Sequence, residues 1–309
     1  MKPGRELTAA VTAFLLAAVL ISSWPTPAQA AVNQPAASSA ICVSSSHPAL
    51  AARISRGIQA ARRGRISFVA VGIDDPGLGI TCRLNSSSHF DSASVVKVTI
   101  LGALLHKAQV QHRHLTGTEE ALALAMITRS DNNAASALWA DVGRYYLQRF
   151  LDLAGMTHTF LGPGGVWGLT QITASDELLL LRHLLDKNPV LDTSSRDYAL
   201  SLMARVIPSQ RWGVPAGAPT SLTVHVKNGW LPLATHGWRI HSIGCFTGRG
   251  GGYSIVVLTQ DNPAMTYGID TIEAIAEVIN RDLNPGATSR IPGSEVSPSW
   301  GTPDEPIPA

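Results

Sequence analysis

The chain has 309 residues, of which 45% are hydrophobic and 15% are charged, and its formal net charge is +2. This is ordinary globular composition, sufficient for one large domain with its own core. The small net charge gives no indication of a nucleic-acid partner.

The first thirty residues have the pattern of a secretory signal peptide. Lys2 and Arg5 precede the apolar run 9–23, and "AQA" occupies 28–30. A basic start, a short apolar core and a small-x-small end are typical of such peptides, and the run is short for a membrane span. We expect cleavage after Ala30, give or take a residue, and a soluble secreted protein that needs no membrane afterwards. An uncleaved anchor is the alternative.

The chain contains three cysteines, Cys42, Cys82 and Cys245, so one of them must stay unpaired within the chain. The count does not describe a disulfide scaffold, and no two cysteines have metal-site spacing. Export allows disulfides to form. A Cys42–Cys82 bridge would join the N-terminal segment to an early strand, and the sequence leaves this pairing open.

The remaining chain divides into a flexible segment at 31–46, a folded domain at 47–283 and a Pro/Ser/Gly-rich tail at 284–309 that we expect to be disordered. Periodicity predicts helices and strands in the folded domain. Thr118 is the expected N-cap of the third helix. The expected helices are 48–64, 94–108, 116–130, 133–143, 144–155, 174–185, 194–206 and 268–283, and the expected strands are 66–73, 80–84, 221–230, 237–248 and 253–261.

This order of elements predicts an α+β fold. Strands from both ends of the chain would join one antiparallel sheet of about five strands in an αβα sandwich. The terminal helices would cover one side of the sheet, and the helical middle of the chain would form a second lobe. A site is expected in the cleft between the lobes.

Ser94 and Lys97 open an apolar helix, where a lysine is unexpected because burying an unpaired ammonium is costly. Residues three apart share a helix face. An amine beside a hydroxyl acts as its general base when desolvation or a cationic neighbour lowers its pKa. Ser94 also lies near a helix N-terminus, which favours developing negative charge. The pair indicates a serine nucleophile, although Ser-x-x-Lys also occurs in inert proteins.

Ser130-Asp131-Asn132 ends a predicted helix. Three polar residues at this place are also typical of an ordinary cap or turn. In the functional interpretation, the Ser130 hydroxyl relays protons. Asn132 hydrogen-bonds a substrate amide and also holds Lys97, and Asp131 braces the turn.

Lys227 ends an alternating strand and is followed by Asn228 and Gly229. The alternative to a functional role is a solvent-facing lysine at a strand end. In the functional interpretation, Lys227 is a second cation that lowers the pKa of Lys97 and of Ser130 and attracts an anionic substrate. Gly229 lets a substrate approach the backbone closely.

The three motifs together are more specific than any one of them. Ser-x-x-Lys, Ser-Asp-Asn and Lys-x-Gly, in this order at 94, 130 and 227, match the signature of class A β-lactamases and penicillin-binding proteins except for Asn228. The chain resembles that superfamily over about residues 47–283, and the resemblance also implies its sandwich fold with a helical lobe. It implies a nucleophile, Ser94; a general base, Lys97; a proton shuttle, Ser130; substrate contacts at Asn132, Lys227, Asn228, Gly229 and Trp230; and an oxyanion hole formed by the backbone N–H groups of Ser94 and Trp230.

The chain departs from this family in the loop at 155–173. Class A β-lactamases carry a glutamate there that activates the water for deacylation, whereas this stretch contains no Asp or Glu. His158 and Gln171 are its conventional candidates for positioning water. Asp176 and Glu177 follow as expected cap and first-turn residues of a helix. We therefore expect acylation to proceed and deacylation to be slow.

A second departure is Asn228, where the family has Thr or Ser to help hold the substrate carboxylate. Asn can still donate a hydrogen bond, with a different reach. Trp230 would add a bulky wall, and Arg239 on the next strand could supply a partner for the carboxylate. Trp167 and Gly168, in the loop without an acid, either shape the cleft or pack it.

The sequence thus predicts a secreted, monomeric serine hydrolase that acts on a small-molecule or peptide substrate, either a β-lactam or a cell-wall-like amide or ester. Neither a metal nor an organic cofactor is needed for this chemistry. The alternatives are a D-Ala-type peptidase or esterase on cell-wall-like substrates, and a protein that binds cell-wall peptides or β-lactams without turnover. A pure binding protein has no need for Lys97, which favours an enzyme.

Overall fold

The computed structural model describes residues 41–248 and 251–289. The predicted signal peptide at 1–30, most of the segment at 31–46 and most of the tail at 284–309 lie outside the described residues. The folded domain predicted at 47–283 falls almost entirely within them.

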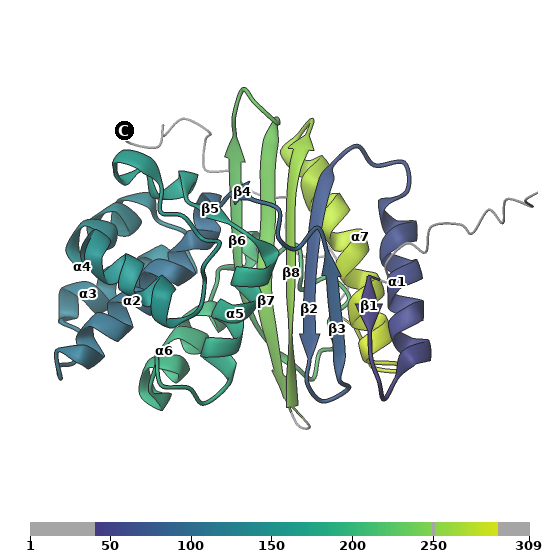
Figure 1. The fold of residues 1–309 in the computed structure, drawn as a ribbon, viewed down its shortest axis with the longest axis horizontal. Coiled ribbons are helices and arrows are strands. Elements are labelled where there is room, and N and C mark those ends of the chain that lie inside the picture. The colour runs from purple at the N-terminus through teal and green to yellow at the C-terminus, as the bar shows by residue number, and fades with distance from the viewer. Residues whose placement is uncertain (1–40, 249–250, 290–309) are drawn as a thin grey trace, which may run out of the picture. The chain divides into compact units, whose positions relative to one another are not determined.

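Strands from the two ends of the chain form one antiparallel sheet of six strands, in the order β1-β3-β2-β8-β7-β6 (Figure 1). The alternating and β-branched runs that predicted strands all pair in it. A two-residue strand at Cys42 makes the sixth strand, one more than expected, and the Cys42–Cys82 disulfide joins it to its neighbour. The strands are β1 (Cys42–Val43), β2 (Phe68–Asp75), β3 (Ile80–Leu84), β6 (Thr223–Pro232), β7 (Trp238–Gly248) and β8 (Gly251–Asn262).

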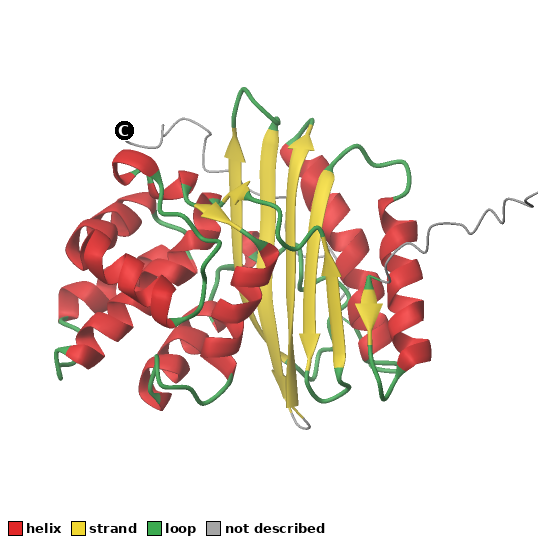
Figure 2. Ribbon diagram, viewed as in Figure 1, coloured by secondary structure: helices red, strands yellow, loops and turns green. Residues whose placement is uncertain are grey.

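Helices lie on both sides of this sheet (Figure 2). The first and last helices, α1 (Pro48–Arg62) and α7 (Met265–Leu283), pack side by side on one face, as predicted (Figure 1). Apolar residues recur along one face of α7, from Ile269 to Ile279, and are buried against the sheet. On the other side lie α2 (Lys97–Val110), α3 (Gly117–Thr128), α4 (Asn132–Leu153), α5 (Ala174–Leu185) and α6 (Thr193–Ala204).

The helix α2 and the 3₁₀ turn η1 (Ala93–Val96) before it form the centre of the helical lobe. By length and composition, Ala93–Val110 is the one helical segment among the described residues that could cross a membrane, but 78% of it is buried inside the protein. It is therefore a core helix. This explains the apolar run around Lys97, whose side chain is fully buried.

Two local details differ from the sequence-based expectation. The N-cap of α3 is Thr116 rather than Thr118, because the Thr116 hydroxyl and the Glu119 carboxylate form a reciprocal capping box. The two helices expected at 133–143 and 144–155 run on as α4, with a kink at Gly143, whose φ is 75°. A small second sheet pairs β4 (Phe90–Asp91) with β5 (Gln171–Ile172), just before the Ser94 turn.

Candidate active site

Ser94 lies in η1, between β4 and the start of α2. The residue before it, Ala93, has a φ of 48°, a left-handed conformation that is costly for a residue with a side chain. On the other side of the turn, the edge strand β6 approaches so closely that a Cβ on Gly229 would lie 2.9 Å from the backbone nitrogens of Ser94 and Val95. Gly229 is therefore required by the close approach of this turn, rather than only by the approach of a substrate.

Lys97 is buried among polar acceptors. Its Nζ donates to the carbonyl oxygen of Ser130 at 2.6 Å, to Oδ1 of Asn132 at 2.8 Å and to Oγ of Ser130 at 3.2 Å. Burial lowers the pKa of Lys97 well below its usual range, and the charge of Lys227 lowers it further, against a smaller opposing effect of Asp131. A lowered pKa favours the neutral amine, which is the form that a general base requires.

Ser130 places its hydroxyl between two lysines. Its Oγ accepts a hydrogen bond of 3.0 Å from Nζ of Lys227 and the 3.2 Å bond from Lys97. Burial lowers the pKa of Lys227 to about 7. Ser130 itself has a φ of 58°, so it is a second left-handed residue in these motifs besides Ala93. The structure thus joins the three sequence motifs through one hydroxyl that can pass a proton.

The turn after Ser130 has the predicted geometry. Oδ1 of Asp131 accepts a 2.7 Å bond from the backbone N–H of Ala134 and caps α4. Asn132 holds Lys97 through its carbonyl oxygen. The Asn132 side chain is only partly buried, and its NH₂ group has no hydrogen-bond partner among the described residues. That group can donate to a substrate amide.

Asn228 and Trp230 do not lie as expected. Alternation along β6 directs Lys227 and Gly229 towards the Ser94 turn and the side chains of Asn228 and Trp230 to the opposite side. Both amide hydrogens of Asn228 are used, at 2.9 Å and 2.8 Å, by the carbonyl oxygens of Gln210 and Trp212. The expected donation from Asn228 to a substrate carboxylate is therefore wrong for this structure, because a loop carbonyl pair already occupies the donors.

The indole of Trp230 lies 6.2 Å from that of Trp212, so the two rings pack together at the side of the strand. The backbone N–H of Trp230 stays a prediction as an oxyanion donor. Its place on the edge strand, one residue after the Gly229 contact with Ser94, is compatible with that role.

The loop at 155–173 is held by hydrogen bonds to the residues on either side of it in the structure. Oδ2 of Asp176 accepts from the backbone N–H of His158 at 2.9 Å and from the Thr159 hydroxyl at 2.7 Å, which ties the start of the loop to the helix after it. The N-cap of that helix, α5, is Thr173 rather than Asp176, because the Thr173 hydroxyl accepts from the backbone N–H of Asp176 at 3.1 Å. Asp176 and Glu177 lie in its first turn. The His158 ring is mostly exposed, and the Gln171 amide is bonded to Asp91. Neither candidate for water positioning points at Lys97.

Trp167 is the loop residue that covers Lys97. Its ring centroid lies 4.7 Å from Nζ of Lys97, and its indole N–H donates to the Ser136 hydroxyl at 3.0 Å. The ring is almost fully buried. An apolar face with this contact attracts a cation weakly and excludes water. Sequence reasoning singled out Trp167 only as a residue that shapes or packs the cleft, and the one sequence signal was its position in a loop without an acid.

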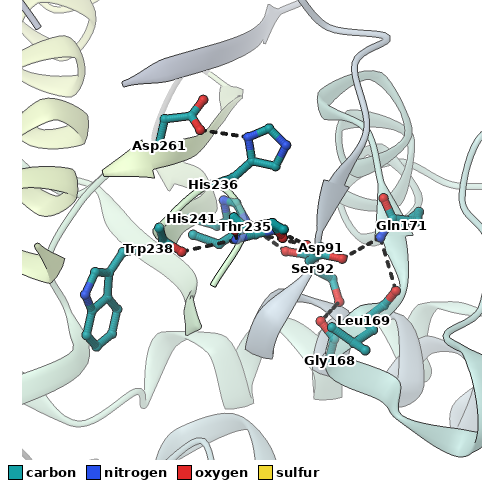
Figure 3. Close-up of polar contacts among 12 residues, drawn as sticks. Asp91, Ser92, Gly168, Leu169, Gln171, Thr235, His236, Trp238, His241 and Asp261 are labelled. Carbon is teal, nitrogen blue, oxygen red and sulfur yellow. Dashed lines mark hydrogen bonds and ion pairs between the residues drawn. The ribbon is translucent and has the colours of Figure 1, made fainter. Parts of the chain in front are cut away.

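Arg239 is not free to receive a substrate carboxylate, contrary to expectation. Its guanidinium pairs with Oδ2 of Asp91, at 2.9 Å from Nε and 2.8 Å from Nη2, and also donates to the carbonyl oxygens of Thr235 and Gly237. Figure 3 shows Asp91 with Gln171 on one side of it and Thr235 and His241 close by on the other. Sequence reasoning missed Asp91, because nothing in the local pattern links residue 91 to residue 239.

The assembled groups can perform nucleophilic acyl transfer. A serine lies at the start of a helix, a buried amine lies one turn along it, and a hydroxyl bridges that amine to a second one. Ser94 Oγ is not among the acceptors of Lys97 in this arrangement, so the amine must release one of them to take the Ser94 proton. Within residues 41–248 and 251–289, no group of three His, Cys, Asp or Glu side chains is placed to hold a metal ion.

Comparisons with known proteins agree with this fold. A family model described as the β-lactamase enzyme family matches residues 112–283, while curated proteins give no match. A class A β-lactamase from Bacteroides cellulosilyticus DSM 14838 is 19% identical over 75% of this chain and 97% of its own, with a TM-score of 0.66.

Two further solved structures are similar to the same part of the chain. A β-lactamase from Sphaerobacter thermophilus DSM 20745 is 21% identical over 74% of this chain and 96% of its own, with a TM-score of 0.63. A mutant of PBP-A, solved as an acyl-enzyme complex with penicillin G, is 17% identical over 74% of this chain and 95% of its own, with a TM-score of 0.62. At these identities the likeness shows a shared fold.

Proposed function

The chain belongs to the β-lactamase enzyme family, and we propose that it is a secreted serine hydrolase that forms an acyl-enzyme on Ser94 with a β-lactam or a related amide or ester. One observation carries the proposal. The Ser130 hydroxyl accepts hydrogen bonds from the buried amines of Lys97 and Lys227. Lys97 follows directly after the η1 turn that holds Ser94 and the left-handed Ala93. This is a proton path from a nucleophile to a leaving group.

Acylation would involve three proton transfers. Neutral Lys97 takes the proton from Ser94 Oγ as this oxygen bonds to the carbonyl carbon, and the backbone N–H groups of Ser94 and Trp230 stabilise the oxyanion. The C–N or C–O bond to the leaving group then breaks. The leaving atom takes the Ser130 proton, and Ser130 regains one from a lysine ammonium beside it.

Deacylation would be slow because the loop covers Lys97 with Trp167, whose indole cannot act as a base towards water. A water must attack the ester carbon of acylated Ser94 while a base accepts its proton. The indole of Trp167 covers Nζ of Lys97 at 4.7 Å and brings no acceptor, and the loop that holds it contains no Asp or Glu. The expected product is an acyl-enzyme that persists.

A peptidase or esterase acting on cell-wall-like substrates is a second candidate. It is favoured by the loss of two expected partners for the substrate carboxylate, since Asn228 donates to loop carbonyls and Arg239 pairs with Asp91. An amide or ester that carries no carboxylate at this position loses no binding through these two changes, whereas a β-lactam or a peptide that ends in a carboxylate does.

Intact-protein mass spectrometry tests the proposal. The protein lacking residues 1–30 is mixed with excess penicillin G, or separately with a neutral thioester, and followed over time, with Ser94→Ala as the control. We expect an adduct on the wild-type protein that forms within minutes and clears over hours, and none on the variant. An adduct with the thioester alone would favour the second candidate.

Two outcomes would contradict the proposal. Equal labelling of wild type and Ser94→Ala would remove Ser94 as the nucleophile. A penicillin adduct that clears as fast as it forms would retain the hydrolase and overturn slow deacylation, which would require another base beside the ester.

Export is part of the same proposal. The basic and apolar segment at 1–30 supports it, and the Cys42–Cys82 disulfide supports an oxidising compartment. Expression of the full chain in a bacterial host with an export pathway should give a product in the envelope or medium whose N-terminus begins near Ala31. A product that keeps Met1 and stays in the cytoplasm would contradict it.

A further inference from the structure

Asp91 is a hub of contacts three residues ahead of Ser94. Its Oδ1 accepts a 2.6 Å bond from the Gln171 amide, and its Oδ2 receives the two-pronged contact from Arg239. Its backbone carbonyl accepts a 2.9 Å bond from Nε2 of His241. The residue is thereby tied to β5 through Gln171 and to β7 through Arg239 and His241 (Figure 3).

The partners of Asp91 are themselves fixed. The Arg239 guanidinium is almost fully buried and also binds the carbonyl oxygens of Thr235 and Gly237. The His241 ring accepts from the backbone N–H of Thr259 through Nδ1, so Nε2 carries the proton that it donates to Asp91. A neutral tautomer follows. Burial lowers the pKa of His241 to about 4, so this contact does not change near neutral pH.

The segment between Asp91 and Ser94 is held from both sides. The backbone N–H of Ser92 donates to the Thr170 carbonyl at 2.8 Å, and Ala93 then takes its left-handed conformation. The opposite side of the turn meets the backbone of Gly229. Strained residues persist only where the surroundings over-determine them. The Asp91 contacts supply that restraint on the upstream side of the nucleophile.

We propose that Arg239, Asp91 and Gln171 form a positioning clamp, which keeps Ala93 left-handed and so fixes the orientation of Oγ and the backbone N–H of Ser94. The alignment bears on catalysis only if Ser94 is the nucleophile, so that part rests on the proposed function. The three are positioning residues, since each acts through the backbone of the Ser94 turn. Buried ion pairs of this kind are weak contributors to stability but can specify one geometry.

Asp91→Asn tests the clamp, because it removes the charge and keeps the shape. The matched control is Asp74→Asn on β2, whose carboxylate is comparably buried and holds Arg83 at 2.7 Å and Arg182 at 3.0 Å. Asp74 pairs in register with Ser254, and Ser254 pairs with Cys245, which lies six residues along β7 from Arg239. At the rise per residue of a strand, this separation is roughly 20 Å.

Two readouts are measured in both variants. The first readout is the kinetics of acylation by penicillin G. It gives three quantities: the acylation rate at saturating penicillin G, the penicillin G concentration that gives half of this rate, and the pH at the midpoint of the rate profile. We expect Asp91→Asn to lower the saturating rate about 30-fold, since misplacement of a nucleophile by about 1 Å costs up to 100-fold, with the other two quantities unchanged. The second is amide hydrogen exchange in a peptide spanning 92–98, which we expect to accelerate about 10-fold. Asp74→Asn should change neither.

The outcomes separate the clamp from the proposed function. If the wild-type protein forms no adduct, the proposed function fails, and hydrogen exchange still decides the clamp. Exchange at 92–98 that is the same in Asp91→Asn and wild type would overturn it, as would an acylation rate equal to that of Asp74→Asn. If Asp91→Asn does not fold, Gln171→Met removes one arm and leaves the ion pair. A wild-type rate and wild-type exchange in that variant would overturn the clamp.

Discussion

The molecule contains two clusters of charged side chains that differ in whether an opposite charge is present. Asp91 and Arg239 neutralise one another, and each makes further hydrogen bonds to neighbouring residues. Lys97 and Lys227 have no carboxylate in ion-pair distance among the described residues, and both amines contact the same hydroxyl. Compensated charge fixes a geometry, whereas uncompensated charge lowers a pKa at a cost in stability. We therefore expect the two lysines to lower the free energy of unfolding, and the Asp91–Arg239 pair to keep one local geometry.

Lys97→Met should give the largest effect and the clearest contrast. It removes the expected general base, so acylation by penicillin G should fall about 1,000-fold, which is about 4 kcal/mol in activation free energy. The melting temperature should not fall. The variant loses the hydrogen bonds of the amine, but it also no longer buries an amine that has no carboxylate partner. Stopped-flow acylation and calorimetry measure the two. A destabilised variant that keeps its acylation rate would reverse the contrast.

Arg239→Met should break the compensated centre. It leaves the Asp91 carboxylate without its cation, and removal of one partner of a buried pair costs about 3 kcal/mol. Urea unfolding measures the change. The matched comparison is Arg53→Met. Arg53 pairs with Asp282 at 3.2 Å, but its side chain is half-exposed. The free energy of unfolding of this variant should therefore fall by less than about 1 kcal/mol. Equal losses would remove the distinction between the two kinds of ion pair.

Lys227→Met should change both the rate and the pH dependence. Acylation should fall about 100-fold with the loss of a charged donor beside Ser130. The pKa of Lys97 should rise once the neighbouring charge is gone, so the acidic limb of the rate profile should move to higher pH. A pH–rate series gives the midpoint, and a midpoint that moves to lower pH would contradict the electrostatic coupling.

The same variant tests the link between pKa and stability. The pKa of Lys227 is about 7 in the folded protein and 10.5 ordinarily, so between these pH values the unfolded chain binds more protons. The stability of the wild-type protein should therefore rise as pH increases from 7 to 10.5. Lys227→Met should be more stable than wild type at pH 7, by an amount that shrinks toward pH 10.5. Parallel stability curves would show that Lys227 does not titrate in this way.

Glu177→Met should give the smallest effect and extend the comparison to an acid. Glu177 is fully buried in the first turn of α5, and neither carboxylate oxygen has a partner among the described residues. Burial raises its pKa well above the usual range, with a further contribution from Asp176. The folded protein therefore binds more protons than the unfolded chain above about pH 4.5, and its stability falls as pH rises through the raised pKa.

Replacement by Met should stabilise the protein by about 1 kcal/mol at pH 8 and remove that slope. Denaturant unfolding at pH 5 and pH 8 measures both effects. Glu120→Met, at an exposed position on α3, is the control and should alter neither. A loss of stability in Glu177→Met at pH 8 would mean that the carboxyl has a role that burial alone does not describe.

Much of the fold could be predicted from the sequence because its signals are local. Leu84 ends the strand expected at 80–84, and α5 spans the residues expected at 174–185, since alternation and helical spacing of apolar residues require no knowledge of distant contacts. The N-cap of α3 was expected at Thr118 and lies at Thr116. This signal is also local, because Thr116 and Glu119 have the spacing of a capping box, whereas the apolar pattern alone pointed to Thr118. The extra strand at Cys42 escaped because two residues carry no periodicity.

The sequence by itself determined which reactive groups the candidate site contains, since three short motifs supply two serine hydroxyls and two lysine amines whose spacing along helix and strand is intrinsic to each element. Only the tertiary structure decided what surrounds them. It places Trp167 over Lys97, occupies Asn228 with the carbonyls of residues 210 and 212, and binds Arg239 to Asp91. Alternation tells which side of a strand a residue faces, but its partner comes from a distant segment, as with Asp91 and Arg239, which are 148 residues apart. Whether a buried charge is neutralised by such a partner or keeps a shifted pKa is therefore decided by the tertiary structure.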